Sequence, residues 1–466
     1  MMRILGVKSW LLAGTFLLFA VSYSHAKTPV CGPGATVPVS GGRNGIEIDK
    51  AWSGVTVSFD AIARNGKTYL GYYDADRWLT VAQLDPVSGV VCRTRLPSQF
   101  AGWDGHNTIA LAFDAAGRLQ VAGNMHASPL VYGAAPSPDS IAGIALSPMI
   151  GTEEESVTYP DFITGPNDKL FFTYRSGVSG DGEWVINVRE GTTWKRASEK
   201  PIFSSTFDGR PTNAYPTPFR VSQDGYVHVA AVWRRTPDVA SNYAITYART
   251  RDFVHWEDHN GQTIMLPMNP GNSDTIESTG ENRGLVNGAR VGVALNGKPV
   301  VAYTKYGSDG RNSIILASPS QNEWHHSIVA TANQQTVIAG GGSVPNLPTV
   351  GDLQVNSGNL GRIVIAFPGE KRKQVLFDID SLNVAVVPEA PARTNSARPV
   401  SINPPPGLAD VRRNSRDIPV DKHPGDTAGT IVYFSQGVNG DKTRKCTRAQ
   451  PTACNPPPSP LIVVPR

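Results

Sequence analysis

The sequence contains few cysteines, few charged residues and no long apolar run beyond its first 26 residues. Only 4 of its 466 residues are cysteine, and none of them has the Cys-x-x-Cys spacing of a zinc site. Charged residues make up 18% of the chain, and the formal net charge is +4. This near balance argues against electrostatic capture of nucleic acid. No later stretch approaches the roughly 18 consecutive apolar residues of a membrane helix, so we expect no span in the mature protein.

The first 26 residues have the pattern of a secretory signal peptide. Arg3 and Lys8 form a positive start, an apolar run follows from Trp10 to Val21, and Ser24-His25-Ala26 is a small-x-small cleavage site. Removing this segment leaves 41 Lys and Arg against 39 Asp and Glu, a net charge of +2. We therefore expect a secreted or periplasmic protein in an oxidising compartment.

All four cysteines lie in the expected mature chain, where an even count predicts disulfide bonds. Three connectivities are possible for four cysteines. We favour Cys31 with Cys92 and Cys446 with Cys454. The second pair lies in a loop that is rich in Pro, Thr and Lys and has no core of its own.

A turn followed by a short strand of β-branched or aromatic residues recurs seven times along the chain. The turns are Asn65-Gly66, Ala116-Gly117, Asn167-Asp168, Asp224-Gly225, Asn296-Gly297, Leu360-Gly361 and Ala428-Gly429. Successive turns lie 51, 51, 57, 72, 64 and 68 residues apart, which is room for about four short strands each. With 46 glycines, 37 prolines and no convincing long amphipathic helix, the chain reads as all-β.

These repeats predict a seven-bladed β-propeller that forms a single domain over residues 27–466. The run from Ile46 to Phe59 is expected to close the ring against the last blade, because closure removes exposed strand edges. The tail contains LIVV and is expected to add one edge strand. We expect a monomer.

Candidate functional residues gather at equivalent strand ends in predicted blades two to four. His106 precedes the strand NTIALAF and His126 follows the next strand, RLQVAG, so antiparallel pairing brings both to one end. Tyr159 precedes the inner strand of blade three, and Arg175 follows the next strand. Arg234 has the same position in blade four. We therefore expect these side chains to face one rim.

These residue types suit β-elimination on a uronic acid. The reaction removes a proton from the carbon next to a carboxylate, whose negative charge must be neutralised. An arginine binds a carboxylate through two hydrogen bonds and stays charged. Histidine and tyrosine can supply the base and the acid. Any one of these residues alone is weak evidence for this function, because each could also have an ordinary structural role. The interpretation depends on their convergence at one rim.

Five segments resemble motifs of the neuraminidase-repeat-like (BNR) propeller polysaccharide lyases, which include ulvan lyases and rhamnose–glucuronate lyases. They are GHN (105–107), NMH (124–126), TYPDF (158–162), FFTYRSGVSGDG (171–182) and WRRTPDVASNY (233–243). The specific motifs cover roughly residues 59–256. From there to the C-terminus the resemblance rests on blade spacing alone. It implies an enzyme that acts on a uronic-acid-containing polysaccharide. Such an enzyme would cleave rhamnose-(1→4)-glucuronate or iduronate linkages by β-elimination and leave an unsaturated uronate.

The resemblance also implies roles for particular residues. His106 and His126 match the paired acid and base, Tyr159 the catalytic tyrosine, and Arg175 the arginine that neutralises the carboxylate. Asn107, Tyr215, Arg234 and Asn242 are expected to bind substrate. The assignment of base and acid among the imidazoles and the phenol stays open. The chemistry requires no cofactor; some members hold a structural zinc or calcium ion, but its ligands cannot be placed in this sequence.

Two other functions stay open. Arg95-Leu96-Pro97 resembles the arginine motif of sialidase-like glycoside hydrolases, and hydrolysis would use carboxylates such as Asp104 and Asp161. A non-catalytic carbohydrate-binding propeller would use tyrosine and tryptophan as stacking platforms. The polymer, and the choice between internal and end-on cleavage, are not fixed by the sequence.

Overall fold

The structure is a computed structural model that describes residues 28–39, 43–356, 359–387 and 402–466. Within these residues the chain forms 37 strands and two short 3-10 turns, Pro166–Asp168 (η1) and Val239–Ser241 (η2). The all-β expectation is therefore confirmed. A search of the described residues finds no helix with the length and apolar character needed to cross a membrane. The expected signal peptide, residues 1–26, lies outside the described residues.

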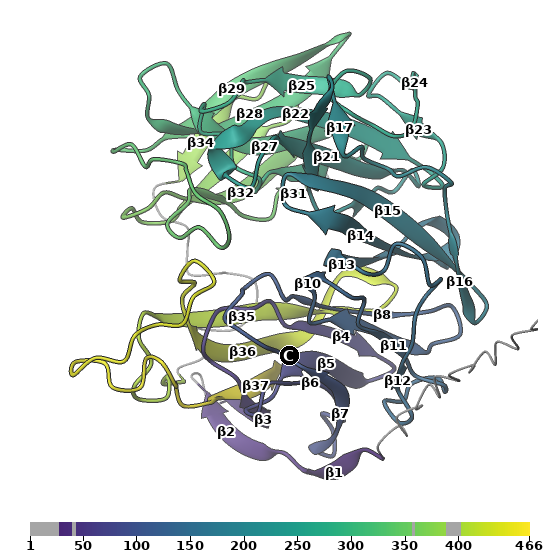
Figure 1. Cartoon of the computed structure of the whole chain (residues 1–466), viewed down its shortest axis with the longest axis vertical. Coiled ribbons are helices and arrows are strands. Elements are labelled where there is room, and N and C mark those ends of the chain that lie inside the picture. The colour runs from purple at the N-terminus through teal and green to yellow at the C-terminus, as the bar shows by residue number, and fades with distance from the viewer. Residues whose placement is uncertain (1–27, 40–42, 357–358, 388–401) are drawn as a thin grey trace, which may run out of the picture.

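Most strands form antiparallel groups of about four that follow one another along the chain and around the molecule (Figure 1). Single parallel contacts join some of these groups into sheets of ten and twelve strands. The sheets before the site are β4 (Asp60–Arg64), β5 (Lys67–Tyr73), β6 (Trp78–Leu84) and β7 (Val90–Gln99), then β8 (Ile109–Phe113), β9 (Leu119–Gly123), β11 (Tyr132–Ala134) and β12 (Ala145–Leu146). Next come β13 (Val157–Thr164), β14 (Leu170–Val178), β15 (Asp181–Glu190) and β16 (Thr193–Arg196), then β19 (Asn213–Pro216), β21 (Val227–Arg234), β22 (Asn242–Thr250) and β23 (Trp256–Glu257).

The later sheets repeat this arrangement. They are β26 (Arg290–Val293), β27 (Pro299–Tyr306), β28 (Asn312–Ser320) and β29 (Glu323–Thr331), then β30 (Thr349–Val350), β31 (Gln354–Val355), β32 (Leu360–Ala366), β33 (Lys373–Asp378) and β34 (Val384–Val387). Neighbouring sheets touch at single parallel contacts, for example Gly182 of β15 with Asn213 of β19 and Ala63 of β4 with Val420 of β35 (Val411–Val420). These arrangements fit a β-propeller.

The two ends of the chain meet in the last sheet. Strand β37 (Ser459–Pro465) pairs on one side with β36 (His423–Gln436) and on the other with β3 (Arg43–Ala51). The expected closure by the segment beginning near Ile46 is thus confirmed, as Figure 1 shows where yellow and purple strands lie side by side. The tail, however, is not an edge strand, because β3 and then β2 (Ala35–Val39) lie outside it.

Two of the seven predicted turns lie inside strands. Leu360-Gly361 opens β32, where Gly361 pairs with Val355 of β31 and Phe377 of β33. Ala428-Gly429 lies inside β36, and the hairpin turn comes earlier, between Val420 and His423. A Cβ atom on Gly429 would come within 2.5 Å of the Val464 carbonyl oxygen. Glycine is therefore needed here for the close approach of β37 and not for a turn.

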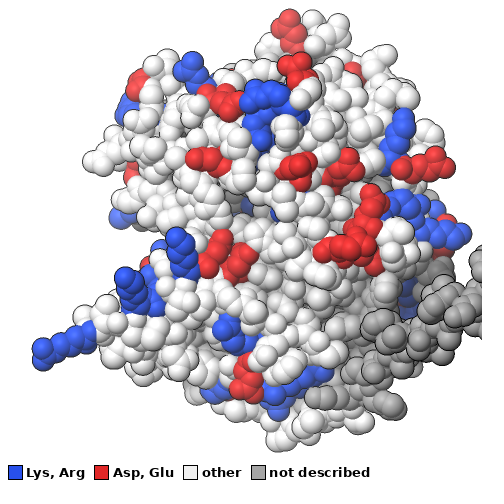
Figure 2. Space-filling view, viewed as in Figure 1, with Lys and Arg blue, Asp and Glu red and all other residues white. Residues whose placement is uncertain are grey.

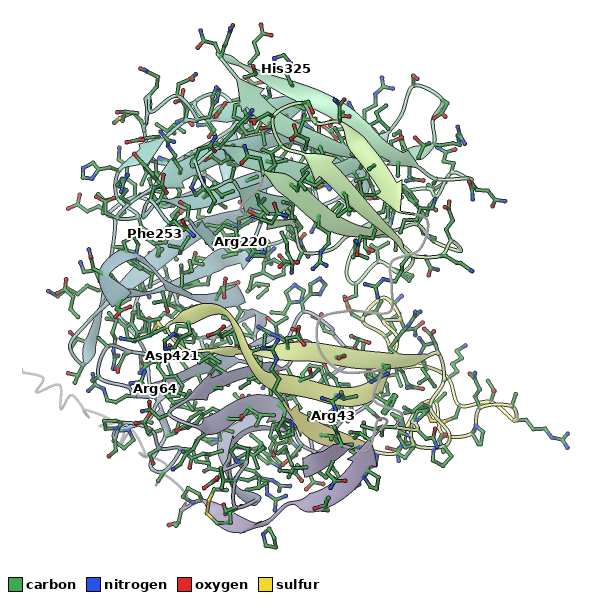
Figure 3. The ribbon with its side chains drawn as sticks, turned by 180° about the vertical axis from the view of Figure 1, so that it is seen from behind. Arg43, Arg64, Arg220, Phe253, His325 and Asp421 are labelled. Atoms are coloured by element: carbon green, nitrogen blue, oxygen red, sulfur yellow. A yellow bond between two sulfur atoms is a disulfide. The ribbon has the colours of Figure 1, made fainter. Side chains whose placement is uncertain are left out.

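The sheets bury both faces against their neighbours. Every residue of β8 and β9 is buried, which explains why these strands read as continuous apolar runs. Phe59 stacks on Tyr433 at 4.4 Å between ring centroids, joining the first sheet to the last. Arg64 reinforces the same junction, because it contacts Asp421 of the last sheet and donates to Asp139 at 2.9 Å (Figure 3).

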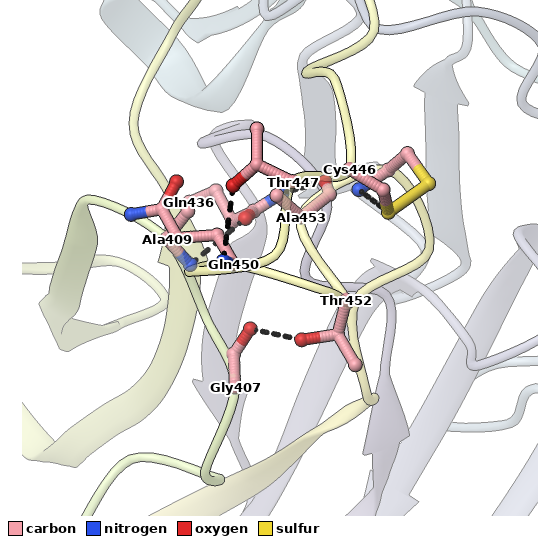
Figure 4. The surroundings of a disulfide bond; sticks show 9 residues. Gly407, Ala409, Gln436, Cys446, Thr447, Gln450, Thr452 and Ala453 are labelled. Carbon is pink, nitrogen blue, oxygen red and sulfur yellow. Dashed lines mark hydrogen bonds between the residues drawn. A yellow bond between two sulfur atoms is a disulfide. The ribbon is translucent and has the colours of Figure 1, made fainter.

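Both expected disulfides are present. Cys31 of β1 (Val30–Pro33) faces Cys92 of β7 in the antiparallel register and is bonded to it. Cys446 is bonded to Cys454 within the long connection between β36 and β37 (Figure 4).

His228, the second residue of β21, should make the protein less stable in acid. The imidazole is fully buried, with Nδ1 2.6 Å from the Tyr247 hydroxyl and Nε2 2.9 Å from Ser222 Oγ. Burial lowers the pKa of His228 to about 4, so the unfolded chain takes up a proton near pH 6.5 that the folded chain does not. The stabilising contribution is present above pH 6.5 and is lost as the pH falls towards 4. We expect this residue to remove about 2–3 kcal/mol of unfolding free energy between pH 7.5 and 4.5.

Urea unfolding of the wild type and of His228→Gln at both pH values measures this loss. The variant should show a smaller drop with acidity than the wild type. His325→Gln, at an exposed position labelled in Figure 3, is the control and should keep the full drop. Equal drops in all three proteins would contradict the assignment.

Candidate active site

An open cavity of about 220 Å³ lies where several sheets present the same strand ends. Its polar lining consists of His106, His126, Tyr159, Ser179, Tyr215, Arg234 and Asn287, and a loop of residues 340–347 supplies Gly340, Gly342, Ser343, Val344 and Leu347. A concave site with a few convergent polar groups is a usual place for a small ligand to bind. The sequence-predicted residues His106, His126, Tyr159, Tyr215 and Arg234 are therefore brought together.

The two histidines form a pair held by one carboxylate. Their rings stack with centroids 4.5 Å apart, and each side chain is about one quarter exposed. One oxygen of Asp104 lies 2.7 Å from His106 Nδ1, and its other oxygen contacts His126 Nδ1. A carboxylate only accepts hydrogen bonds, so both Nδ1 atoms carry protons. Neither Nε2 atom has a hydrogen-bond partner among the described residues, which leaves both free for a ligand.

Asp104 remains ionised in this environment. Burial works against its charge, but hydrogen bonds from His106 and His126 and from the His106 backbone amide hold the pKa of the Asp104 carboxyl well below its usual range. The carboxylate thus fixes the tautomer and the orientation of both imidazoles. Asp104 lies two residues before His106 in the sequence, so its role could have been inferred from that spacing.

The same three residues form the one possible metal-binding group found in the described part of the chain. The ligand atoms of Asp104, His106 and His126 lie within 4.8 Å of one another. The set does not fit calcium, which takes six to eight oxygen ligands. Two imidazoles and one carboxylate are zinc-type donors, but Asp104 accepts the Nδ1 protons of both imidazoles. This pairing does not fit one ion bound by all three residues.

Tyr159 lies beside the imidazole pair in an unusual backbone conformation. Its φ is +58°, and the pairing of β13 with β14 is interrupted between Thr158 and Asp161. The ring lies 5.9 Å from that of His106 and stacks on Trp184 at 6.0 Å. Burial, followed by the neighbouring Tyr215, raises the pKa of the Tyr159 phenol to about 12. The phenol is therefore protonated at neutral pH and can donate a hydrogen bond.

Arg175 lies beneath Tyr159 and does not line the cavity. It is fully buried, donates one hydrogen bond of 3.1 Å to Thr158 Oγ1, and has its Cζ 5.1 Å from the Tyr159 ring centroid. Its Nε and Nη1 atoms are buried without a partner. Gly182 makes room for this side chain, because a Cβ there would come within 2.9 Å of Arg175 Cγ. The expectation that Arg175 faces the rim with the histidines is not met, since Tyr159 covers it.

Arg234, at the end of β21, is the guanidinium that reaches the cavity. It donates to Asn242 Oδ1 (2.8 Å), to the Tyr215 hydroxyl (3.0 Å) and to Asn287 Oδ1 (2.8 Å). All three acceptors are neutral, and no described carboxylate forms an ion pair with Arg234. Its positive charge is therefore held rigidly but is not compensated, which favours an anionic ligand.

The remaining predicted residues lie behind this lining. Asn242 holds Arg234 and donates to the Leu285 carbonyl, and Asn107 donates to the Asp104 carbonyl at 3.2 Å. Neither lines the cavity, so both support its wall. The sequence reasoning did not identify Asn287 or the loop of residues 340–347. These segments come from distant parts of the chain and carry no local motif.

Comparison with known proteins identifies relatives of this fold. The family model described as "BNR repeat-containing family member" matches residues 67–334. The crystal structure of the polysaccharide lyase Uly1 is similar, with a TM-score of 0.57 and 14% identity over 95% of this chain and 100% of that one. The structure of a family PL25 ulvan lyase bound to -[GlcA(1-4)Rha3S]- has a TM-score of 0.58 and 13% identity over 84% of this chain and 93% of that one. No curated protein sequence matches. At these identities the likeness establishes a common fold.

Proposed function

The chain belongs to the BNR repeat-containing family, and we propose that it is a polysaccharide lyase that cleaves a uronic-acid-containing polymer by β-elimination. The observation that carries this proposal is the cavity itself, in which an uncompensated guanidinium, a protonated phenol and two imidazoles with free Nε2 atoms converge. The finer proposal is a rhamnose-(1→4)-glucuronate or iduronate linkage. It is supported by the sequence motifs and by the lyases named above that share the fold.

The first task of the site is to hold the uronate carboxylate. We assign this to Arg234, which has donor hydrogens left after its three hydrogen bonds and has no anionic partner. Neutralising the carboxylate makes the proton on the adjacent carbon C5 more acidic. Arg175 contributes its positive charge from beneath Tyr159 and does not contact the substrate in this proposal.

The second task is proton transfer. One of the two free Nε2 atoms takes the C5 proton, and the electrons of that bond form the C4–C5 double bond. The C4–O bond breaks, and its oxygen receives a proton from the Tyr159 phenol. This leaves an unsaturated uronate at one new end and a hydroxyl on the departing rhamnose. The side chains supply every proton step, so we propose no cofactor for the chemistry.

We further infer that the propeller has seven blades within one domain of residues 27–466. Each of the seven predicted bursts forms the second strand of a sheet, namely β5, β9, β14, β21, β27, β32 and β36. A secreted or periplasmic location is supported by the two disulfides, which persist in oxidising compartments. We propose that the protein acts as a monomer.

An absorbance screen tests the proposed function. The protein is incubated with rhamnose-linked glucuronans and other uronate polymers, and the ultraviolet absorbance of an unsaturated uronate is followed. A lyase produces this absorbance, a glycoside hydrolase produces reducing ends without it, and a binding protein produces neither. Binding of these polymers with no absorbance from any of them would overturn the lyase proposal.

Asp104→Asn should lower kcat about 10–100-fold, because the imidazole pair loses its orienting acceptor. Asp104→Glu keeps the carboxylate and should retain more of the rate than Asp104→Asn. Thermal unfolding measures how much of each variant is folded, and a folded Asp104→Asn protein with the wild-type kcat would contradict the assigned role.

A further inference from the structure

The connection between β36 and β37, residues 437–458, carries an excess of positive charge beside the cavity. We call it the stapled loop, because the Cys446–Cys454 disulfide closes its outer part. It contains Lys442, Arg444, Lys445 and Arg448 but a single acid, Asp441. Figure 1 shows this yellow segment projecting to the left from the lower sheets, and basic side chains appear on that edge in Figure 2.

Three of these cations lack an anionic partner. Arg444 pairs with Asp410 at 3.1 Å. Lys442, Lys445 and Arg448 are exposed and form no ion pair within the described residues. Their charges are therefore available to a ligand.

The stapled loop is held in place at several points. Gln436 Nε2 donates to the Ala453 carbonyl at 2.9 Å, Ala453 is fully buried, and the Thr452 hydroxyl donates to the Gly407 carbonyl (Figure 4). Together with the disulfide, these contacts fix the backbone that carries the lysines. A fixed backbone reduces the entropy lost when a ligand binds.

The loop begins at the wall of the cavity. Asp441 accepts a hydrogen bond of 3.1 Å from the amide of Ser343, which lines the cavity and has its Oγ 3.4 Å from His106 Nδ1. Val438 packs beside Gly105, where a Cβ would lie 3.4 Å from Val438 Cγ1. Lys442 follows Asp441 directly, so the first of the unpaired cations lies next to the cavity rim at Ser343.

We propose that the stapled loop binds the part of the polyuronate chain that extends out of the cavity. A cavity of about 220 Å³ encloses little more than a single sugar ring, so a longer chain must continue over the rim. Such a chain carries repeated carboxylates, and the loop presents unpaired cations along one exit. This inference rests on the proposed function, since it assigns a second contact to the same substrate.

A matched pair of double variants tests the loop. Lys442→Ser/Lys445→Ser removes two of its charges. Lys67→Ser/Lys169→Ser removes two lysines at the opposite strand ends, where Lys67 begins β5 and Lys169 directly precedes β14. At low salt, the loop variant should raise KM for long polyuronate about 5–20-fold with kcat unchanged, and the difference should shrink as salt is added. A short oligosaccharide that fills the cavity should show no change. The control should match the wild type, and a loop variant that also matches it would overturn the proposal.

Affinity electrophoresis through gels containing unsulfated polyglucuronate separates this inference from the lyase proposal. Wild type and control should be retarded, the loop variant much less, and none of them by neutral dextran. If no absorbing product is ever formed but this pattern holds, the loop inference stands and the lyase proposal fails. Equal retardation of loop variant and control overturns the loop inference, whether or not turnover occurs.

Discussion

Replacing Arg234 with alanine should lower kcat/KM about 10²–10³-fold or more, because the substrate carboxylate loses its charge partner in the transition state. No described carboxylate neutralises this guanidinium, so its charge is free to act on the substrate. The substitution also leaves Asn242, Tyr215 and Asn287 without their donor. Some loss of stability is therefore expected as well.

Two further variants make this result interpretable. Arg234→Lys keeps the positive charge but loses the planar set of guanidinium N–H donors. It should therefore be faster than Arg234→Ala but slower than the wild type. Arg235→Ala is the matched control, because Arg235 is the next residue but donates to the Phe207 carbonyl and stacks on Tyr243 outside the cavity lining. Thermal unfolding measures how much of each variant is folded. A folded Arg234→Ala protein with near-normal turnover would remove Arg234 from the mechanism.

Tyr159→Phe should lower kcat about 10²–10⁴-fold, because the leaving oxygen loses its proton donor. The aromatic ring remains, so the stack on Trp184 and the cover over Arg175 should persist. The raised pKa of the Tyr159 phenol, about 12, keeps the donor protonated through neutral and mildly alkaline pH. Single-turnover kinetics on a defined oligosaccharide would show the loss in the cleavage step.

The control for this variant is Tyr226→Phe. The Tyr226 hydroxyl donates to Glu257 at 3.0 Å and lies outside the cavity lining, so its removal should leave kcat unchanged. A Tyr159→Phe rate within a few-fold of the wild type would contradict the assignment of the donor. The proton would then have to come from the imidazole pair.

Much of the fold could be predicted because its turns are local. Asn65 and Gly66 both have positive φ, which is the conformation that a tight hairpin requires and that this dipeptide favours. The position of the tail could not be predicted. A strand reading LIVV is equally suited to an edge or an interior place, and pairing with β3 from the other end of the chain decides between them.

The candidate site was predictable where strand order alone determines position. His106 and His126 flank one antiparallel pair, so their convergence follows from β8 and β9. Strand order predicts Arg175 at the rim, but the side chain is buried behind Tyr159. Strand order does not reveal that Tyr159 adopts a left-handed backbone conformation and covers Arg175. The loop of residues 340–347 and the stapled loop meet at Ser343 and Asp441, which are 98 residues apart, and no local pattern signals that contact.

The most direct test of the elimination mechanism is a count of chain ends during cleavage of a rhamnose-linked glucuronan. New reducing ends and new ultraviolet-absorbing ends are measured in the same reaction. Elimination by the Arg234, Tyr159 and imidazole groups predicts one absorbing end for every reducing end. Reducing ends that accumulate without absorbing ends would show that water cleaves the bond. The proposed β-elimination would then be wrong.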